Sequence, residues 1–224
     1  MENNSIHVSQ EGLERENNQD SAAFCFLEDR ELWVIADGVT NAKDSGKFMS
    51  LFCTEIKNQW LANNAPVEID QINDLIKSVH EKIRRLYICG KGSFLLLIID
   101  ISADLQHCFY IGDCRIGVIT NNSISWKNFP HSLVYANGER DEKKLCEDPS
   151  RHTLYRVFKA KRFQVPEYHS FQLDLSKPFI LATDGYWSNF PAQLPVELSF
   201  SSISDHLKKL EGKDDSTIVI RLAT

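Results

Sequence analysis

Apolar residues recur at helical spacing in two adjacent stretches, and this pair of patterns limits the possible folds more than any other feature. The first stretch runs from Phe48 to Ile56 and the second from Ile72 to Leu86. Each pattern predicts a helix with one apolar face, so both helices should pack against a flat surface such as a sheet. Groups of strand-like apolar runs precede and follow the pair. Strands grouped around a helical pair favour an α+β layered domain over an alternating βαβ one.

The strand-like runs are short and are separated by turns. Tight turns at 102–104 and 112–113 would join three of them into antiparallel hairpins. The charged stretch 136–151 predicts a surface loop, which could also be a flap beside an active site, and a short helix is expected near 201–210. We expect one domain over residues 1–224, because this length does not require two. The expected strands are residues 21–27, 32–36, 93–101, 105–111, 114–120, 169–174, 178–183 and 216–222.

The composition argues against several classes of protein. The formal net charge is −6 and the basic residues are spread along the chain, which argues against nucleic acid as a partner. The most apolar stretch, Phe94 to Ile99, is too short to span a bilayer, and the polar start lacks the apolar core of a signal peptide. The six cysteines are scattered along the chain and include no C-x-x-C pair. This spacing is typical of reduced thiols and offers no zinc site. We therefore expect a cytoplasmic protein with no membrane or nucleic-acid partner.

Four short segments place an acidic residue at the edge of an apolar, strand-like run. The acidic residues are Asp20, Asp37, Asp184 and Asp214, and Arg15 lies close before the first. Carboxylates that a fold brings together at strand ends make an oxygen-rich pocket, which hard cations such as Mg²⁺ and Mn²⁺ prefer. Arginine is suited to holding a phosphate. A metal site that handles phosphate is therefore the leading interpretation.

These segments, in this order, resemble those of the metal-dependent protein phosphatases of type 2C, and the resemblance covers nearly the whole chain. A single Asp-Gly pair would be weak, because any turn can supply one, whereas seven segments in order are specific. The seven segments are Arg15–Asp20, Trp33–Gly38, Gly92–Ser93, Ile111–Arg115, Pro130–Leu133, Leu181–Trp187 and Asp214–Thr217.

The resemblance implies an α+β fold, a four-layer α-β-β-α sandwich of two antiparallel sheets flanked by helices. It also implies two bridged Mg²⁺ or Mn²⁺ ions. Asp37 would bridge them, Asp184 and Asp214 would complete the first site, and the Gly38 carbonyl would help to form the second. Asp20 would hold metal-bound waters.

The activity implied by the resemblance is that of a Mg²⁺- or Mn²⁺-dependent serine/threonine protein phosphatase, with a phosphorylated protein as its substrate. A phosphate monoester is dianionic and repels hydroxide. Two adjacent cations neutralise it and lower the pKa of a bound water to about 7. Metal-bound hydroxide would attack directly, so no protein nucleophile is needed, and Arg15 would bind the phosphate.

Four positions depart from the family's pattern. Gln19 removes an anionic ligand of the second metal, and Val39 stands where animal members carry a His thought to act as a general acid. Cys114 replaces the usual Ser. Ser188 replaces an Asp of the family's pattern. This change weakens any third, looser metal site on Asp113 and Asp184. Asp113 is as readily explained as a turn residue.

Several alternatives stay open at this point. Asp215 is adjacent to Asp214, and either could be the ligand, although counting back from Thr217 favours Asp214. The chain could be a catalytically silent binding module on the same scaffold. It could also be a hydrolase for a small phosphorylated metabolite.

Overall fold

A computed structural model describes residues 4–189, 194–210 and 212–223. The protein belongs to the α+β class and has two antiparallel sheets, each in its own compact unit. Unit 1 combines the chain up to Asn18, Gly112–Arg156 and the chain from Leu173 onward. Unit 2 combines Gln19–Ile111 with Val157–Gln172. The predicted fold class, with two antiparallel sheets backed by helices, is confirmed.

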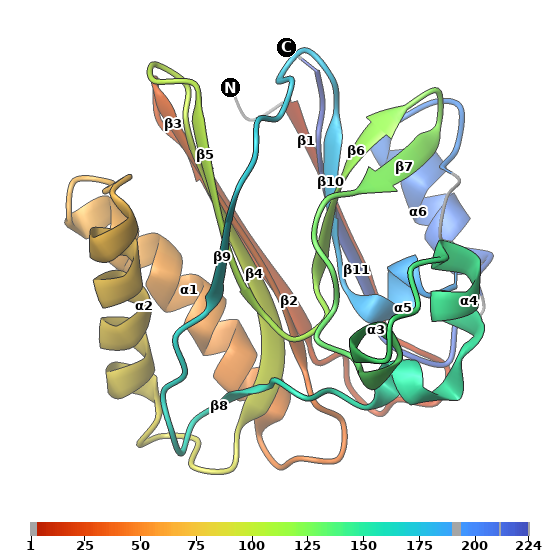
Figure 1. The fold of residues 1–224 in the computed structure, drawn as a ribbon, viewed down its shortest axis with the longest axis horizontal. Coiled ribbons are helices and arrows are strands. Elements are labelled where there is room, and N and C mark those ends of the chain that lie inside the picture. The colour runs from red at the N-terminus through yellow and green to blue at the C-terminus, as the bar shows by residue number, and fades with distance from the viewer. Residues whose placement is uncertain (1–3, 190–193, 211, 224) are drawn as a thin grey trace. The chain divides into compact units, whose positions relative to one another are not determined.

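Unit 2 is a six-stranded sheet with two helices packed on one face (Figure 1). The helices are α1, Ser45–Ala62, and α2, Ile69–Ile83. They bury the predicted apolar faces against the sheet, where Phe52 of α1 and Ile76 of α2 share a buried cluster with Phe94. The strand order is β2-β3-β4-β5-β9 with β8 paired to β4, and the bounds are β2 Asp20–Phe26, β3 Arg30–Gly38, β4 Lys91–Asp100, β5 Leu105–Ile111, β8 Phe158–Lys159 and β9 Glu167–Ser170.

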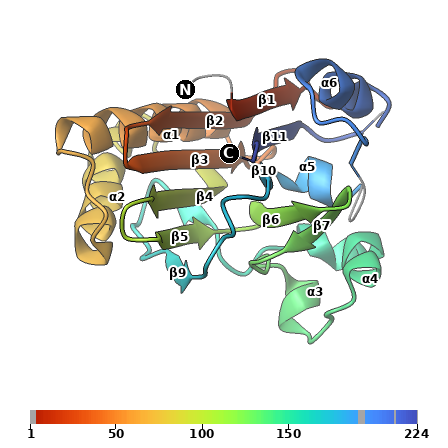
Figure 2. The same ribbon diagram turned by 90° about the horizontal axis from the view of Figure 1, so that it is seen from above.

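Unit 1 is a five-stranded antiparallel sheet with its own helices. Helix α6, Phe200–Lys208, lies beside the first strand (Figure 2). Its Ile203 and Leu207 join Ile180 and Ile218 of the sheet in the buried cluster of this unit. The strand order is β1-β11-β10-β6-β7, and the bounds are β1 Ser5–Gln10, β6 Arg115–Thr120, β7 Ser123–Trp126, β10 Phe179–Ala182 and β11 Ser216–Arg221. Four short helical segments complete the unit: α3 Leu133–Ala136, α4 Glu142–Glu147, the 3₁₀ helix η2 Pro149–His152 and α5 Asp184–Trp187.

The charged stretch 136–151 differs from the surface loop predicted for it. Helix α4 and η2 occupy most of its second half. Helix α4 begins after Asp141, whose carboxylate accepts a hydrogen bond from the Lys144 amide at 2.9 Å and so caps the helix. Leu145 is the one buried residue of α4, so no apolar period marks this helix in the sequence.

Three edge strands differ from the prediction. The strand expected over 169–174 ends at Ser170, and neither β1 nor β7 is among the expected strands. In β1 only Ile6 and Val8 are buried, which is too short an alternation to stand out. Among the helices in the described part of the chain, none has both the length and the apolar content needed to span a membrane.

Candidate functional site

Unit 2 holds two of the predicted metal-site acids, and they face each other. Asp20 begins β2 and Asp37 lies near the end of β3, and the antiparallel register places the two residues directly opposite one another. Directly opposed side chains project from the same face of a sheet, with their Cβ atoms about 5 Å apart. Two carboxylates in this arrangement repel each other, and a cation near both would relieve the repulsion.

Two glycines keep the backbone close at this end of the sheet. A Cβ on Gly38 would lie 2.7 Å from the Gly46 nitrogen, and one on Gly92 would lie 2.4 Å from the Asp37 oxygen. Neither position has room for a larger residue without moving backbone. The Asp-Gly and Gly-Ser segments seen in the sequence therefore have a steric reason, because they let β3 and β4 approach the start of α1 beside Asp37.

Unit 1 contains a cavity of about 280 Å³ that brings together three of the predicted site residues: Arg15, Asp184 and Asp214. Of the described residues that line it, three carry a positive side chain and three an acidic one. Such a cavity can accept an anion beside its arginines and a cation beside its carboxylates. Among the residues that the structure describes, the lining consists of Glu14, Arg15, Arg151, His152, Asp184, Ser188, Asn189, Lys213 and Asp214.

Arg15 and Asp214 form a close ion pair in this cavity. The Arg15 Nη2 atom lies 2.5 Å and the Nε atom 2.8 Å from the same Asp214 oxygen, Oδ1. The neighbouring Asp215 is buried instead, and its Oδ1 accepts a hydrogen bond from the Gly12 amide at 2.9 Å. Of the two acids that the sequence left open, Asp214 is therefore the one that lines the cavity.

Asp184 enters the cavity from the first turn of α5. Hydrogen bonds join the end of β10 to β11 just before it: the Thr183 amide donates to the Thr217 carbonyl at 3.1 Å, and the Thr217 amide donates to Thr183 Oγ1 at 2.9 Å. These contacts explain the two Thr residues in the motifs. They place Asp184 and Asp214, which lie far apart in the sequence, at the same end of one sheet.

Two residues of η2 that the sequence analysis did not select lie beside Asp184. Arg151 Nη1 is 3.8 Å and His152 Nδ1 is 3.7 Å from Asp184 Oδ2. Burial, followed by the charge of Arg151, lowers the pKa of His152 below its ordinary value, so its ring is neutral at neutral pH. The suggestion that the charged run could be a flap beside the site was the only sequence signal for these residues.

Asp113, predicted as a turn residue or weak metal ligand, follows Gly112, whose φ of 98° favours glycine. Asp113 is buried, and its carbonyl accepts a hydrogen bond from the Trp187 indole nitrogen at 2.8 Å. It does not take part in the lining of the 280 Å³ cavity. These contacts are those expected of Asp113 as a turn residue. Its role as a weak metal ligand stays a prediction.

The predicted metal ligands are of a type that suits a hard divalent cation. Each unit contains two of the predicted acidic residues. Asp20 opposes Asp37 in unit 2, and Asp184 shares a cavity with Asp214 in unit 1, so the donors are carboxylate oxygens. Within residues 4–189, 194–210 and 212–223, no group of three or more acidic, His or Cys side chains could hold a metal ion. In unit 1 a cation would also have to share Asp214 with Arg15, or displace it.

Comparison with known proteins shows the fold. No protein-family model and no curated protein sequence matches the chain. Among solved structures, the chain is similar to the PPM Ser-Thr phosphatase MsPP from Mycobacterium smegmatis in complex with cacodylate, with a TM-score of 0.77 and 16% identity over 98% of each chain. It is also similar to the serine/threonine phosphatase Stp1 from Staphylococcus aureus, with a TM-score of 0.75 and 18% identity over 98% of this chain and 94% of that one. The serine/threonine phosphatase PstP/Ppp from Mycobacterium tuberculosis gives a TM-score of 0.69 and 17% identity over 98% of each chain. The predicted resemblance is thus confirmed at the level of structure, and this chain has the fold of the PPM-type serine/threonine phosphatases.

Proposed function

We propose that this protein is a Mg²⁺- or Mn²⁺-dependent phosphatase that removes phosphate from phosphoserine or phosphothreonine in a protein substrate. The observation that carries the proposal is the unit 1 cavity, in which Arg15, Asp184 and Asp214 converge as the motifs predict. The similar structures with this fold are named as serine/threonine phosphatases, which supports a phosphoprotein substrate. No membrane or nucleic-acid partner is needed for this role.

The residues proposed to hold the metal ions are those that the resemblance to the type 2C phosphatases implies. Asp37 would serve two ions, with Asp184 and Asp214 at one of them and the Gly38 carbonyl at the other. Asp20, opposite Asp37, would orient water, and Asp113 is the candidate for a third, looser ion. Mg²⁺ or Mn²⁺ in such a site supplies Lewis acidity and a water whose pKa is lowered toward neutrality.

The chain's own side chains have simple tasks in this proposal. Arg15 offers a planar guanidinium to the phosphate, and the carboxylates orient water. No residue of the chain has to form a covalent bond to phosphorus. His152 lies close to Asp184, but with its lowered pKa it is neutral and would not act as a standing positive charge.

The decisive experiment measures phosphate release from a phosphothreonine peptide with Mn²⁺, with Mg²⁺ and with a chelator. We expect release with either metal and none with the chelator. Asp37→Asn and Asp184→Asn should abolish release and weaken Mn²⁺ binding measured by calorimetry, whereas Asp205→Asn, a change at an exposed acid of α6, should leave both unchanged. Near wild-type turnover of either variant at saturating Mn²⁺ would overturn the metal assignment. Activity on sugar or nucleotide phosphates far above that on phosphopeptides would instead favour a small-metabolite hydrolase.

A catalytically silent binding module is the second candidate function. It is favoured by the basic side chains that already neutralise the unit 1 carboxylates, namely Arg15 on Asp214 and Arg151 beside Asp184. Gln19 in place of an acidic residue points the same way. The same assays separate the candidates, because a silent module would bind a phosphopeptide without releasing phosphate under any metal condition.

A further inference from the structure

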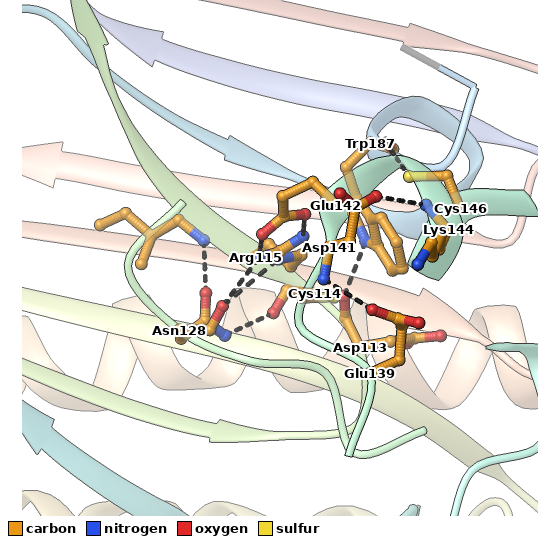
Figure 3. Close-up of polar contacts among 11 residues, drawn as sticks. Asp113, Cys114, Arg115, Asn128, Glu139, Asp141, Glu142, Lys144, Cys146 and Trp187 are labelled. Atoms are coloured by element: carbon orange, nitrogen blue, oxygen red, sulfur yellow. Dashed lines mark hydrogen bonds and ion pairs between the residues drawn. The ribbon is translucent and has the colours of Figure 1, made fainter. Parts of the chain in front are cut away.

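Arg115 is an arginine with no exposed side-chain surface, and it makes a two-pronged ion pair with Glu142 (Figure 3). Its Nη1 lies 2.7 Å from Glu142 Oε2, and its Nη2 lies 2.9 Å from Oε1. Paired contacts of this kind between guanidinium and carboxylate are stronger and more directional than single ones. Glu142 is the first residue of α4, so the contact joins β6 to the start of the α4–η2 segment, which we define as Glu142–His152.

The other surroundings of Arg115 hold its position from the side of the sheet. Its Nε and Nη2 atoms donate to the Asn128 carbonyl at 3.3 and 3.2 Å. The Asn128 side chain is itself held by the Cys114 carbonyl and the Ile116 amide. The guanidinium also lies 5.2 Å from the ring centre of Trp187, in the helix that begins at Asp184. Arg115 therefore contacts both helical elements that reach the cavity.

The α4–η2 segment runs from the contact with Arg115 to the cavity, and only one residue, Asp148, separates its two helices. Helix α4 ends at Glu147, and Asp148 then caps η2 by accepting a hydrogen bond from the Ser150 amide at 2.7 Å. Within α4, Leu145 is buried and the Cys146 thiol lies 3.5 Å from the Trp187 carbonyl (Figure 3). Glu142 and Arg151 therefore lie near opposite ends of one short segment of capped helical turns.

Arg151 presents unused hydrogen-bond donors to the cavity. Its side chain is 17% exposed, and its guanidinium makes no hydrogen bond with any residue that the structure describes. The 3.8 Å separation from Asp184 is an ion pair too long for a hydrogen bond. A guanidinium carries five N–H donors in a fork that matches phosphate oxygens. Phosphate is therefore the ligand that this side chain fits.

We propose that Arg151 binds the phosphate of the substrate, and that Arg115 is a positioning residue that holds Arg151 in the cavity wall through Glu142. The substrate class in this inference rests on the proposed function, whereas the binding of phosphate by Arg151 does not require turnover. The residues involved all belong to unit 1.

The test measures the affinity of inorganic phosphate for the full-length, metal-free protein by calorimetry. Arg151→Ala should weaken binding by about 10- to 100-fold, the range for losing a charge-assisted hydrogen bond. Glu142→Gln should weaken it by a smaller factor, and the double variant should bind no more weakly than Arg151→Ala, because Glu142 acts through Arg151. Glu147→Gln removes the same charge from an exposed site in the same helix and should leave affinity unchanged.

Three outcomes would overturn the inference: wild-type protein that binds no phosphate, Arg151→Ala with unchanged affinity, or effects of the two changes that multiply in the double variant. Glu142 is part-exposed, so Glu142→Gln should fold, and circular dichroism and the unfolding midpoint verify this. Arg115→Lys is a second route, since it keeps the charge but loses the fork and should weaken phosphate binding as Glu142→Gln does. Phosphate binding that depends on Arg151, in a protein that hydrolyses nothing, would contradict the proposed function and leave this inference intact.

Discussion

Arg15 shows how one side chain can serve two partners in the unit 1 cavity. Two of its donors, Nη2 and Nε, contact Asp214 at 2.5 and 2.8 Å. Both side chains are partly exposed, so water screens their attraction and the pair can open at modest cost. A phosphate would compete with Asp214 for Arg15, and a metal ion would compete with Arg15 for Asp214.

We predict that Arg15→Ala raises KM for a phosphopeptide by about 10- to 100-fold, because a charge-assisted contact to phosphate is lost. The same change should tighten Mn²⁺ binding, because Asp214 no longer shares its charge with a guanidinium. Arg15→Lys should recover only part of KM, since an ammonium cannot reproduce the fork. The kinetics and a Mn²⁺ titration of the three proteins give both answers. Unchanged KM in Arg15→Ala would leave Arg15 with a structural role only.

The sequence is informative for candidate-site residues at the ends of strands and uninformative for those placed by contacts between distant residues. Asp184 and Asp214 follow or precede apolar strands, and neighbouring strands bring their ends together. Arg151 lies in η2, which comes after the short, highly charged helix α4. Its position depends on the contact between Arg115 and Glu142, which no local pattern reveals.

At the scale of secondary-structure elements, the long helices are predictable from the sequence and the short ones are not. Helices α1 and α2 were predicted because each buries a full stripe of apolar residues, and that stripe gives the period. Helix α4 depends on a cap at Asp141 and one buried residue, Leu145, so its sequence looks like a solvated run.

Helix α2 also carries a buried titratable group at its junction with β8. The His80 side chain is fully buried, its Nε2 lies 3.0 Å from the Lys159 carbonyl, and the rings of Phe158 and Phe163 lie against it. Burial lowers the pKa of His80 from its ordinary value of 6.5. The neutral ring, donating to Lys159, is therefore the form that the fold requires.

We predict that His80 makes the protein less stable in mild acid. Well above pH 6.5 the ring is neutral in both the folded and unfolded states, so its stabilising contribution is complete. As the pH falls below 6.5, the unfolded state takes up the proton first, and stability declines toward the folded pKa. His80→Gln keeps an amide donor without the titration. Urea unfolding between about pH 7.5 and 5 should show wild type losing up to about 1.4 kcal/mol per pH unit more than His80→Gln. Parallel pH profiles would contradict the prediction.

At the scale of the whole molecule, the chain passes between the two units four times, after residues 18, 111, 156 and 172. Neither unit is a continuous piece of sequence, so neither can be cut out with all its strands. We keep the prediction of one domain over residues 1–224, and its consequence is a single cooperative unfolding transition.

The four tryptophans allow this prediction to be tested in each unit separately. Trp33 and Trp60 belong to unit 2, and Trp126 and Trp187 belong to unit 1. When both tryptophans of one unit are replaced by Phe, the remaining tryptophan fluorescence reports only on the other unit. We expect the two double variants to show fluorescence transitions that coincide with their own circular dichroism transitions in urea. Separate midpoints within one variant would show that the units unfold independently.

The pairing of β1 with β11 has a consequence for how the protein is made. Ser5 lies opposite Arg221, so the strand at the start of the described chain has its partner near the end. During synthesis, β1 emerges before β11 and cannot form this pair until β11 has also been made. Four strands of unit 2 and both of its helices, all within Gln19–Ile111, leave the ribosome long before that. The sheet of unit 1 can close only after translation has passed Arg221, so the cavity with Asp184 and Asp214 forms late, and a ribosome that stalls earlier releases a chain without it.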